Sequence, residues 1–260
     1  MKIIIMTVLT FLLAAVLVFG NLHWNSKMSE PTLTSDKTDT TKNSASESDS
    51  EIDQEYYLKL ANNWPKKAQN QLKNKLTNNE SYKIILLGSN SISNDNHSLE
   101  ESLKKTLYNK YENHVELESI TFDGTTADYI HEDKSASLIA KKPDMIIFEP
   151  FLLNDNNVIP IPETISNITS IINVTTEALP DVSFILQPPN QIYDANLYPM
   201  QVDALQEYAK VQNLIYLNHW EAWPDGKDAA VNDYLNVSAR PNKSGYKLWS
   251  TYLSEYLISE

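Results

Sequence analysis

The chain has 260 residues, with 34 acidic against 21 basic side chains, a formal net charge of −13 and no cysteine. This length suits one globular domain of roughly 200 residues with additional segments. The acidic balance disfavours nucleic acid as a partner, because phosphate binding depends on clustered Lys and Arg, and the lack of cysteine excludes disulfides, thiolate metal sites and a lipid-modified cysteine anchor.

The first 20 residues predict a membrane segment. After Lys2, the stretch from Ile3 to Gly20 (IIIMTVLTFLLAAVLVFG) carries no charge. About 18 residues is near the lower limit for crossing a bilayer and long for the core of a signal peptide. No clear small-x-small cleavage site precedes Asn21. Residues 1–20 are therefore predicted to form a signal anchor that is not cleaved. With Lys2 inside, we expect a single-pass membrane protein whose C-terminal domain is extracellular, or a secreted protein if the segment is cleaved.

Residues 21–51 are rich in Ser, Thr, Asp, Lys and Asn and have almost no apolar side chains. Such a segment cannot bury enough surface to offset the entropy of ordering it, so it predicts a disordered extracellular linker. The folded domain is expected over residues 52–260. It begins with one or two helices between Glu55 and Asn78, interrupted at Pro65.

Strands and helices then alternate to the end of the chain. Short apolar runs predict strands, and longer amphipathic segments, the first opened by the capping pattern of Ser98 and Glu101, predict helices. The expected strands are Lys83–Gly88, Val115–Phe122, Asp144–Phe148, Val182–Gln187 and Leu214–Leu217, and the helices that follow them are Ser98–Tyr111, Thr126–Lys141, Pro162–Leu179, Pro199–Val211 and Asn242–Ile258. This order indicates an α/β domain with a parallel sheet.

The polar clusters of the domain all follow strands. They read GSNS, DGTT, FLLND, PPNQIY and NHWEAW. Because the carboxyl ends of parallel strands meet at one edge of the sheet, these loops should converge on a single crevice. Gly88 lacks the partner glycines of a dinucleotide fingerprint, and no metal or nucleotide cofactor is indicated.

From Lys83 to Glu260 the set of loops resembles the SGNH, or GDSL-type, esterase family. Gly88 to Ser91 stands at the family's GDS turn, Gly124 at its second-block glycine, Asn154 and Asp155 at its Asn-Asp pair. The resemblance implies a three-layer α/β/α sandwich with a five-stranded, flavodoxin-like parallel sheet. It also implies that Gly124 and Asn154 stabilise the oxyanion of an ester reaction; ordinary turn and capping roles are the alternative. The phrases EPFLLND, QPPN and HWEAWP suggest a divergent branch from Gram-positive bacteria.

The nucleophile is ambiguous. Counting from Gly88, the family serine falls on Asn90, which cannot act as a nucleophile. A shift of one residue makes Ser91 the nucleophile, with Asn90 in the Asp position, and Ser89 is the other hydroxyl of the turn. We favour Ser91 over Ser89.

The base is the larger departure from the family. Arg240, followed by Pro241 and Asn242, stands where the family has its histidine; a guanidinium stays protonated and only donates hydrogen bonds. Arg240 could bind a carboxylate, a sulfate or a carbonyl oxygen. His219 is the substitute base, oriented by Glu221 or Asp225. Alternatively, His219 bridges its loop or joins Trp220 in a sugar-binding platform.

These inferences predict an exported SGNH-like serine esterase that acts on O-acyl groups of a cell-envelope polysaccharide. Its partners would be an ester-bearing small molecule or glycan, and the membrane through its N-terminal helix; a monomer is expected. The alternative is a catalytically inactive protein of the same fold that binds an envelope glycan or helps to assemble it. The replacement of the family histidine by Arg240 motivates that alternative.

Overall fold

The structure is a computed structural model that describes residues 53–94 and 97–259. All of these residues belong to one compact unit, Ser48–Glu260. The signal anchor expected over residues 1–20 and the linker expected over residues 21–51 lie outside the described residues. Among the residues that are described, no helix combines the length and the apolar character that crossing a bilayer requires.

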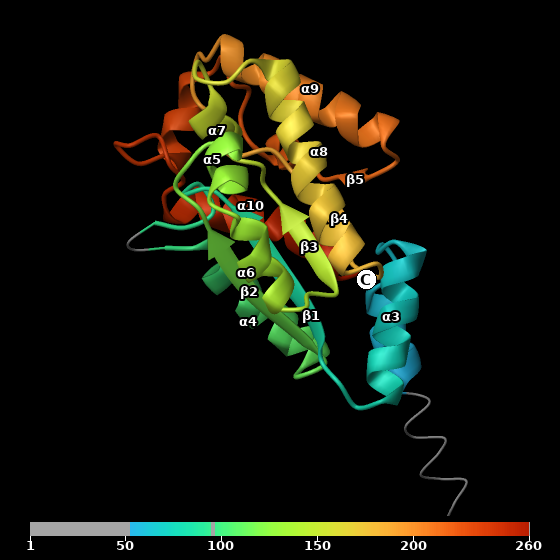
Figure 1. Cartoon of the computed structure of the whole chain (residues 1–260). Coiled ribbons are helices and arrows are strands. Elements are labelled where there is room, and N and C mark those ends of the chain that lie inside the picture. The colour runs from blue at the N-terminus through green and yellow to red at the C-terminus, as the bar shows by residue number, and fades with distance from the viewer. Residues whose placement is uncertain (1–52, 95–96, 260) are drawn as a thin grey trace, which may run out of the picture. The chain divides into compact units, whose positions relative to one another are not determined.

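The centre of the domain is a parallel sheet of five strands in the order β2-β1-β3-β4-β5 (Figure 1). The strands are β1 (Tyr82–Gly88), β2 (Val115–Thr121), β3 (Met145–Phe148), β4 (Ser183–Leu186) and β5 (Ile215–Tyr216). Every residue of β3 and β4 is buried, as their continuous apolar runs predict. The predicted five-stranded, flavodoxin-like sheet is therefore confirmed, although β5 is shorter than the predicted Leu214–Leu217.

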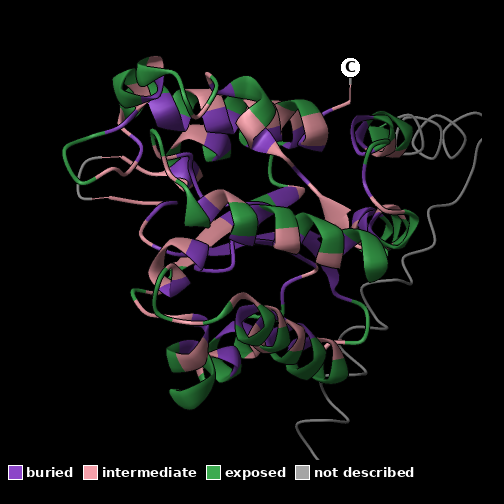
Figure 2. Cartoon of the chain, turned by 90° about the horizontal axis from the view of Figure 1, so that it is seen from above, coloured by how far each residue is buried: buried purple, intermediate pink, exposed green. Residues whose placement is uncertain are grey.

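Helices cover both faces of the sheet. One face packs against helical residues 53–60, α3 (Lys66–Thr77), α4 (Leu99–Tyr111) and α10 (Lys243–Leu257). The other face packs against α5 (Thr126–His131), α6 (Lys134–Ala140), α7 (Leu152–Asp155), α8 (Ile161–Ala178) and α9 (Leu197–Val211). Two short 3₁₀ helices, η1 (His219–Ala222) and η2 (Ala229–Tyr234), precede α10. In Figure 2 the buried positions gather on the strands and on the inner sides of the helices, which is the predicted three-layer sandwich.

The helix predicted over Thr126–Lys141 is instead two helices, α5 and α6. Asp133 between them has a left-handed backbone, with a φ of 50°, which ends the first helix and starts the second in a new direction. The start of α5 is fixed by a capping box between Thr125 and Asp128. The Ser98 cap of α4 is confirmed: its hydroxyl accepts a hydrogen bond from the Glu101 N–H at 3.0 Å.

Side chains alternate between the two faces along each strand and set which groups arrive at the carboxyl edge. Leu86 of β1 belongs to the core cluster beneath α10, and Leu87 belongs to the cluster beneath α8. The register pairs Leu87 with Phe148 and Phe148 with Leu186. Glu149 and Gln187, which come next after β3 and β4, therefore lie side by side just past the strands.

Candidate active site

The site lies at the point where the strand order reverses. The chain passes from β1 outward to β2 and then returns to β3 on the other side of β1. The loops that leave β1 and β3 there run in opposite directions at the carboxyl edge of the sheet, where open α/β folds usually bind their ligands; we refer to this region as the crevice. The crevice holds the loop after β1, with Ser89, Asn90 and Ser91, and the loop after β3, which starts with Glu149.

Ser89 and Glu149 form a buried pair. The Ser89 N–H donates to Glu149 Oε2 at 2.6 Å, and the Ser89 hydroxyl donates to the same oxygen at 2.7 Å. Ser89 is 1% exposed and Glu149 is fully buried. Burial raises the pKa of Glu149 to about 8, and the hydrogen bonds from Ser89 only partly oppose this. The ionised form of Glu149 is therefore a stronger base than an ordinary carboxylate.

Gly88 makes this close approach possible. A Cβ at Gly88 would lie 2.8 Å from Glu149 Oε2 and 2.9 Å from Ile92 Cγ2, distances that real Cβ atoms do not show. The glycine is therefore required here by space rather than by an unusual backbone conformation. It lets the carboxyl group of Glu149 lie against the end of β1 and meet the Ser89 N–H.

Ser91 lies beside this pair without joining it. The Ser91 N–H donates to Ser89 Oγ at 3.1 Å, and the Ile92 N–H donates to the Ser89 carbonyl at 3.1 Å, which closes a turn. The Ser91 side chain is nearly enclosed, at 3% exposed, and within the described chain its hydroxyl makes no hydrogen bond. Of the two predicted serines, only Ser89 contacts a carboxyl group through its hydroxyl. Asn90, at the tip of the turn, is half-buried.

The structure brings Gly124 and Asn154 together, as the resemblance implies. Asn154 Nδ2 donates to the Gly124 carbonyl at 2.9 Å. The neighbouring Asp155 is buried and accepts from the Thr126 N–H at 2.8 Å and from the hydroxyls of Thr126 and Thr164, both at 2.7 Å. Asp155 therefore ties the starts of α5 and α8 to α7 and holds Asn154 against Gly124.

His219 is placed differently from the sequence-based expectation. Nε2 of His219 lies 2.8 Å from the Pro188 carbonyl, which can only accept, so Nε2 carries the proton and donates it. Nδ1 is therefore unprotonated and accepts a hydrogen bond from the Trp223 indole N–H at 3.0 Å. The ring stacks on Trp249, with centroids 4.0 Å apart. Burial lowers the pKa of His219 to about 3. Neither ring nitrogen remains to take a proton from Ser89, so the expected role as general base does not fit this geometry.

Trp220 lines a cleft of about 320 Å³ between the loops that follow β4 and β5. Its indole N–H donates to the Pro189 carbonyl at 2.7 Å, and its ring meets the edge of Tyr198, with centroids 5.4 Å apart. Gln191 and Asp225 are among the other lining residues. The cleft thus has an aromatic wall and polar groups, a combination that suits a sugar ring.

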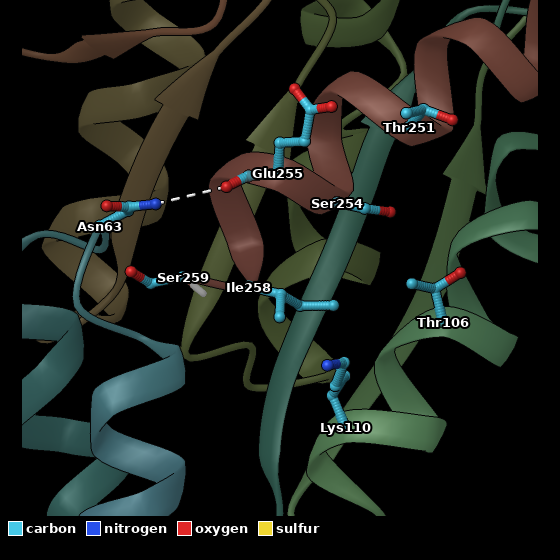
Figure 3. A pocket seen from close by; sticks show the side chains of 8 residues that line it. All are labelled: Asn63, Thr106, Lys110, Thr251, Ser254, Glu255, Ile258 and Ser259. Carbon is cyan, nitrogen blue, oxygen red and sulfur yellow. Dashed lines mark hydrogen bonds between the residues drawn. The ribbon is translucent and has the colours of Figure 1, made fainter.

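A larger groove of about 480 Å³ lies elsewhere, between the C-terminal halves of α4 and α10 (Figure 3). Asn63 Nδ2 donates to the Glu255 carbonyl at 3.3 Å across one side of it. None of the residues predicted for the site lines this groove. It faces the amino edge of the strands, because α4 and α10 both run away from the carboxyl edge, so its size does not make it the candidate active site.

Three polar residues of the site were not predicted from the sequence: Glu149, Gln187 and Asn190. All are fully buried, and each has a polar atom without a hydrogen-bond partner in the described chain: Oε1 of Glu149, Nε2 of Gln187 and Oδ1 of Asn190. Their signal was positional, since each follows β3 or β4 within four residues. No group of acidic or histidine side chains in the described ranges could hold a metal ion.

No protein-family model matches the sequence, and no curated protein matches it either. Solved structures do share the fold. A carbohydrate esterase family 3 protein from Talaromyces cellulolyticus has a TM-score of 0.58 at 15% identity, over 68% of this chain and 96% of that one. The lipase/acylhydrolase from Enterococcus faecalis has a TM-score of 0.55 at 18% identity, over 67% and 94%. A GDSL-like lipase from Bacteroides thetaiotaomicron has a TM-score of 0.50 at 12% identity, over 72% and 96%.

These likenesses show that the domain has the α/β fold of GDSL-like lipases and related esterases. At such identities they concern the fold, and function has to be argued from the site itself.

Proposed function

We propose that the protein is a serine esterase in which Ser89 is the nucleophile and Glu149 is the general base. The observation that carries this proposal is the 2.7 Å contact between the Ser89 hydroxyl and a buried carboxyl group whose pKa is raised to about 8. This pair lies at the carboxyl edge of the sheet, in a fold shared with esterases and lipases.

In the reaction, ionised Glu149 takes the Ser89 proton as Oγ attacks the acyl carbonyl. Glu149 then returns this proton to the departing alcohol, which leaves an acyl ester on Ser89. A water molecule, deprotonated by the same carboxylate, releases the acid and restores the hydroxyl. The Asn154 amide, fixed beside Gly124, is the side-chain donor available to the oxyanion. Because Ser89 is 1% exposed, the groups around its hydroxyl have to move before an ester can reach it.

We further propose that the substrate is an O-acylated polysaccharide of the cell envelope and that the domain is exported. The apolar stretch from Ile3 to Gly20 and the polar stretch after it support export and tethering. The cleft beside Trp220 supports a sugar substrate. One structure with the same fold is a mutant of an acetyl-xylooligosaccharide esterase from Geobacillus, and this likeness supports an acylated sugar as the substrate.

A second function is favoured by one observation and by one sequence-based expectation. Both ring nitrogens of His219 are bonded within the protein, and the resemblance to GDSL-type esterases predicts Arg240 at the position of their histidine. A protein that binds an envelope glycan without hydrolysing it would need neither a free imidazole nor an exposed nucleophile. Such a protein would bind the glycan in the crevice without hydrolysing an ester.

Hydrolysis of 4-nitrophenyl acetate by the purified protein separates the two functions. We expect turnover that is abolished in Ser89→Ala and in Glu149→Gln, with kcat/KM rising with pH and levelling off above about 8. A fluorophosphonate should label Ser89, located by peptide mass spectrometry. Labelling of Ser91 instead would refute the choice of nucleophile, and neither turnover nor labelling would leave the binding function.

A further inference from the structure

Arg240 is the one arginine in the sequence. Its backbone is bonded to Asn236, whose Oδ1 accepts from the Arg240 N–H at 3.1 Å and whose N–H donates to the Arg240 carbonyl at 2.8 Å. The guanidinium itself has no hydrogen bond or ion pair with any described residue, although the chain has 34 carboxylate side chains to offer. Arg240 is half-buried, so this cation is partly withdrawn from water.

The backbone on either side of Arg240 is bonded to two loops of the crevice. Asn190, after β4, donates from Nδ2 to the Ala239 carbonyl at 3.0 Å. Asn94, after β1, donates from Nδ2 to the Pro241 carbonyl at 2.9 Å. Ala239 has a left-handed backbone, with a φ of 56°, a conformation that a non-glycine residue keeps only when its surroundings hold it. Arg240 is therefore fixed between the loops that follow β1 and β4.

Tyr246 shows that this position is in electrostatic reach of the proposed catalytic pair. Tyr246 is buried, and its hydroxyl accepts a hydrogen bond from Asn94 at 3.4 Å. Burial raises the pKa of Tyr246; the positive charge of Arg240 acts against this and the negative charge of Glu149 adds to it. Both charged groups therefore lie close enough to the same phenol to influence it.

Asn190 supplies a second, independent indication of a ligand. It is fully buried, its Nδ2 is used by the Gln191 and Ala239 carbonyls, and its Oδ1 has no donor in the described chain. A buried acceptor without a partner is costly and is usually satisfied by an ordered water molecule or by a ligand. Between the loops that follow β1 and β4, Arg240 and Asn190 thus provide one positive charge and one acceptor that has no donor in the described chain.

We infer that Arg240 binds a carboxylate of the substrate and that Asn190 Oδ1 accepts a hydrogen bond from a hydroxyl of the same sugar, which makes the substrate an acidic, acylated glycan. The inference rests on the proposed function and specifies its substrate class. The planar guanidinium matches a carboxylate with two parallel hydrogen bonds, and its single charge equals the single charge of that group. In this position Arg240 recognises substrate rather than taking a proton.

The test compares kcat/KM of the full chain for acetylated methyl glucuronoside and for acetylated methyl glucoside. One charge-assisted contact should give a preference of about 10- to 100-fold for the acidic sugar, which falls toward 1 in Arg240→Gln. Arg240→Lys, which keeps the charge without the planar fork, should retain part of the preference and also controls for misfolding. The preference should weaken as salt is raised.

Lys243→Gln is the matched control, because it removes an exposed positive charge three residues away. An equal loss of preference in Lys243→Gln and Arg240→Gln would overturn the inference, because it would mean that any nearby positive charge attracts the acidic sugar without a specific contact. Equal rates for both sugars, with 4-nitrophenyl acetate still hydrolysed, would overturn the inference and leave the esterase standing.

If no ester is hydrolysed, the proposed esterase function is refuted. Calorimetric titration with methyl glucuronoside then tests separately whether Arg240 binds a carboxylate. Binding that is lost in Arg240→Gln supports the subsite in a binding protein, and no binding overturns it. Stronger binding of inorganic phosphate than of the glucuronoside would also overturn the assignment of a carboxylate.

Discussion

Replacing Glu149 by Gln should remove a pH dependence of folding stability that this one carboxyl group creates. In the folded protein the pKa of Glu149 is about 8, whereas its ordinary value is 4.5. Between these values the folded state holds a proton that the unfolded state has released, so raising the pH favours unfolding. The contribution of Glu149 is complete below pH 4.5 and is lost as the pH rises through 8.

His219 works in the opposite direction at lower pH. Its pKa is about 3 in the folded protein against an ordinary 6.5, so between these values the unfolded state binds the extra proton and stability rises with pH. The two effects largely cancel between about pH 4.5 and 6.5. The effect of Glu149 is therefore best measured above pH 7, where the imidazole is neutral in both states.

Each pH unit in which one proton is released on unfolding changes the free energy of unfolding by about 1.4 kcal/mol. As Glu149 itself starts to ionise near pH 8, the loss between pH 7 and 8.5 should be roughly 1 kcal/mol. Urea denaturation followed by tryptophan fluorescence measures this difference. The slope should vanish in Glu149→Gln and persist in Glu118→Gln, which alters a partly exposed carboxylate paired with Lys141. A flat profile in the unaltered protein, or an unchanged slope in Glu149→Gln, would refute the raised pKa.

Two further substitutions test how the crevice is built. Gly88→Ala places a Cβ 2.8 Å from Glu149 Oε2 and should lower the free energy of unfolding by about 1–3 kcal/mol in urea denaturation; an unchanged midpoint would mean that the carboxyl group is not held there. Asp155→Asn puts an NH₂ group where the Thr126 N–H or a hydroxyl now donates and should lower the free energy of unfolding by about 1–3 kcal/mol. The shift of the urea midpoint should be larger than in Asp128→Asn, which alters an exposed carboxylate. Equal midpoint shifts in the two Asn variants would mean that the hydrogen bonds of Asp155 to Thr126 and Thr164 do not stabilise the fold.

The fold could be predicted because local patterns and global arrangement agree along this chain. The buried strands read as apolar runs, and the period of the helices places their apolar sides on the sheet. The exceptions have local causes. A left-handed Asp133 divides the helix predicted over Thr126–Lys141, and β5 makes only two ladder pairs with β4. Neither feature leaves a signal in hydrophobic periodicity.

The site was predictable in its location but not in its pairings. The serines, Gly124 and Asn154 were expected at the carboxyl edge and are found there. Which hydroxyl meets a carboxyl group depends on the register of β1 and β3, since Leu87 pairs with Phe148 and thereby sets Gly88 beside Glu149. His219 was attractive because it comes within three residues of the end of a strand. Its burial under Trp249 is a tertiary contact that no local pattern contains.

The cost of Glu149 to the fold argues that the residue has a function. A fully buried carboxyl group with one oxygen unpartnered in the described chain destabilises the folded state, and an apolar side chain of similar volume at the end of β3 would avoid that cost. Gly88 is constrained for the same carboxyl group, so two positions of the sequence are committed to it. Structural glutamates are ordinarily paired with a cation or exposed, and Glu149 is neither. Sequences retain such conflicts with stability mainly where a site requires them, and this one lies at the strand-order reversal, against the hydroxyl that a serine esterase would activate.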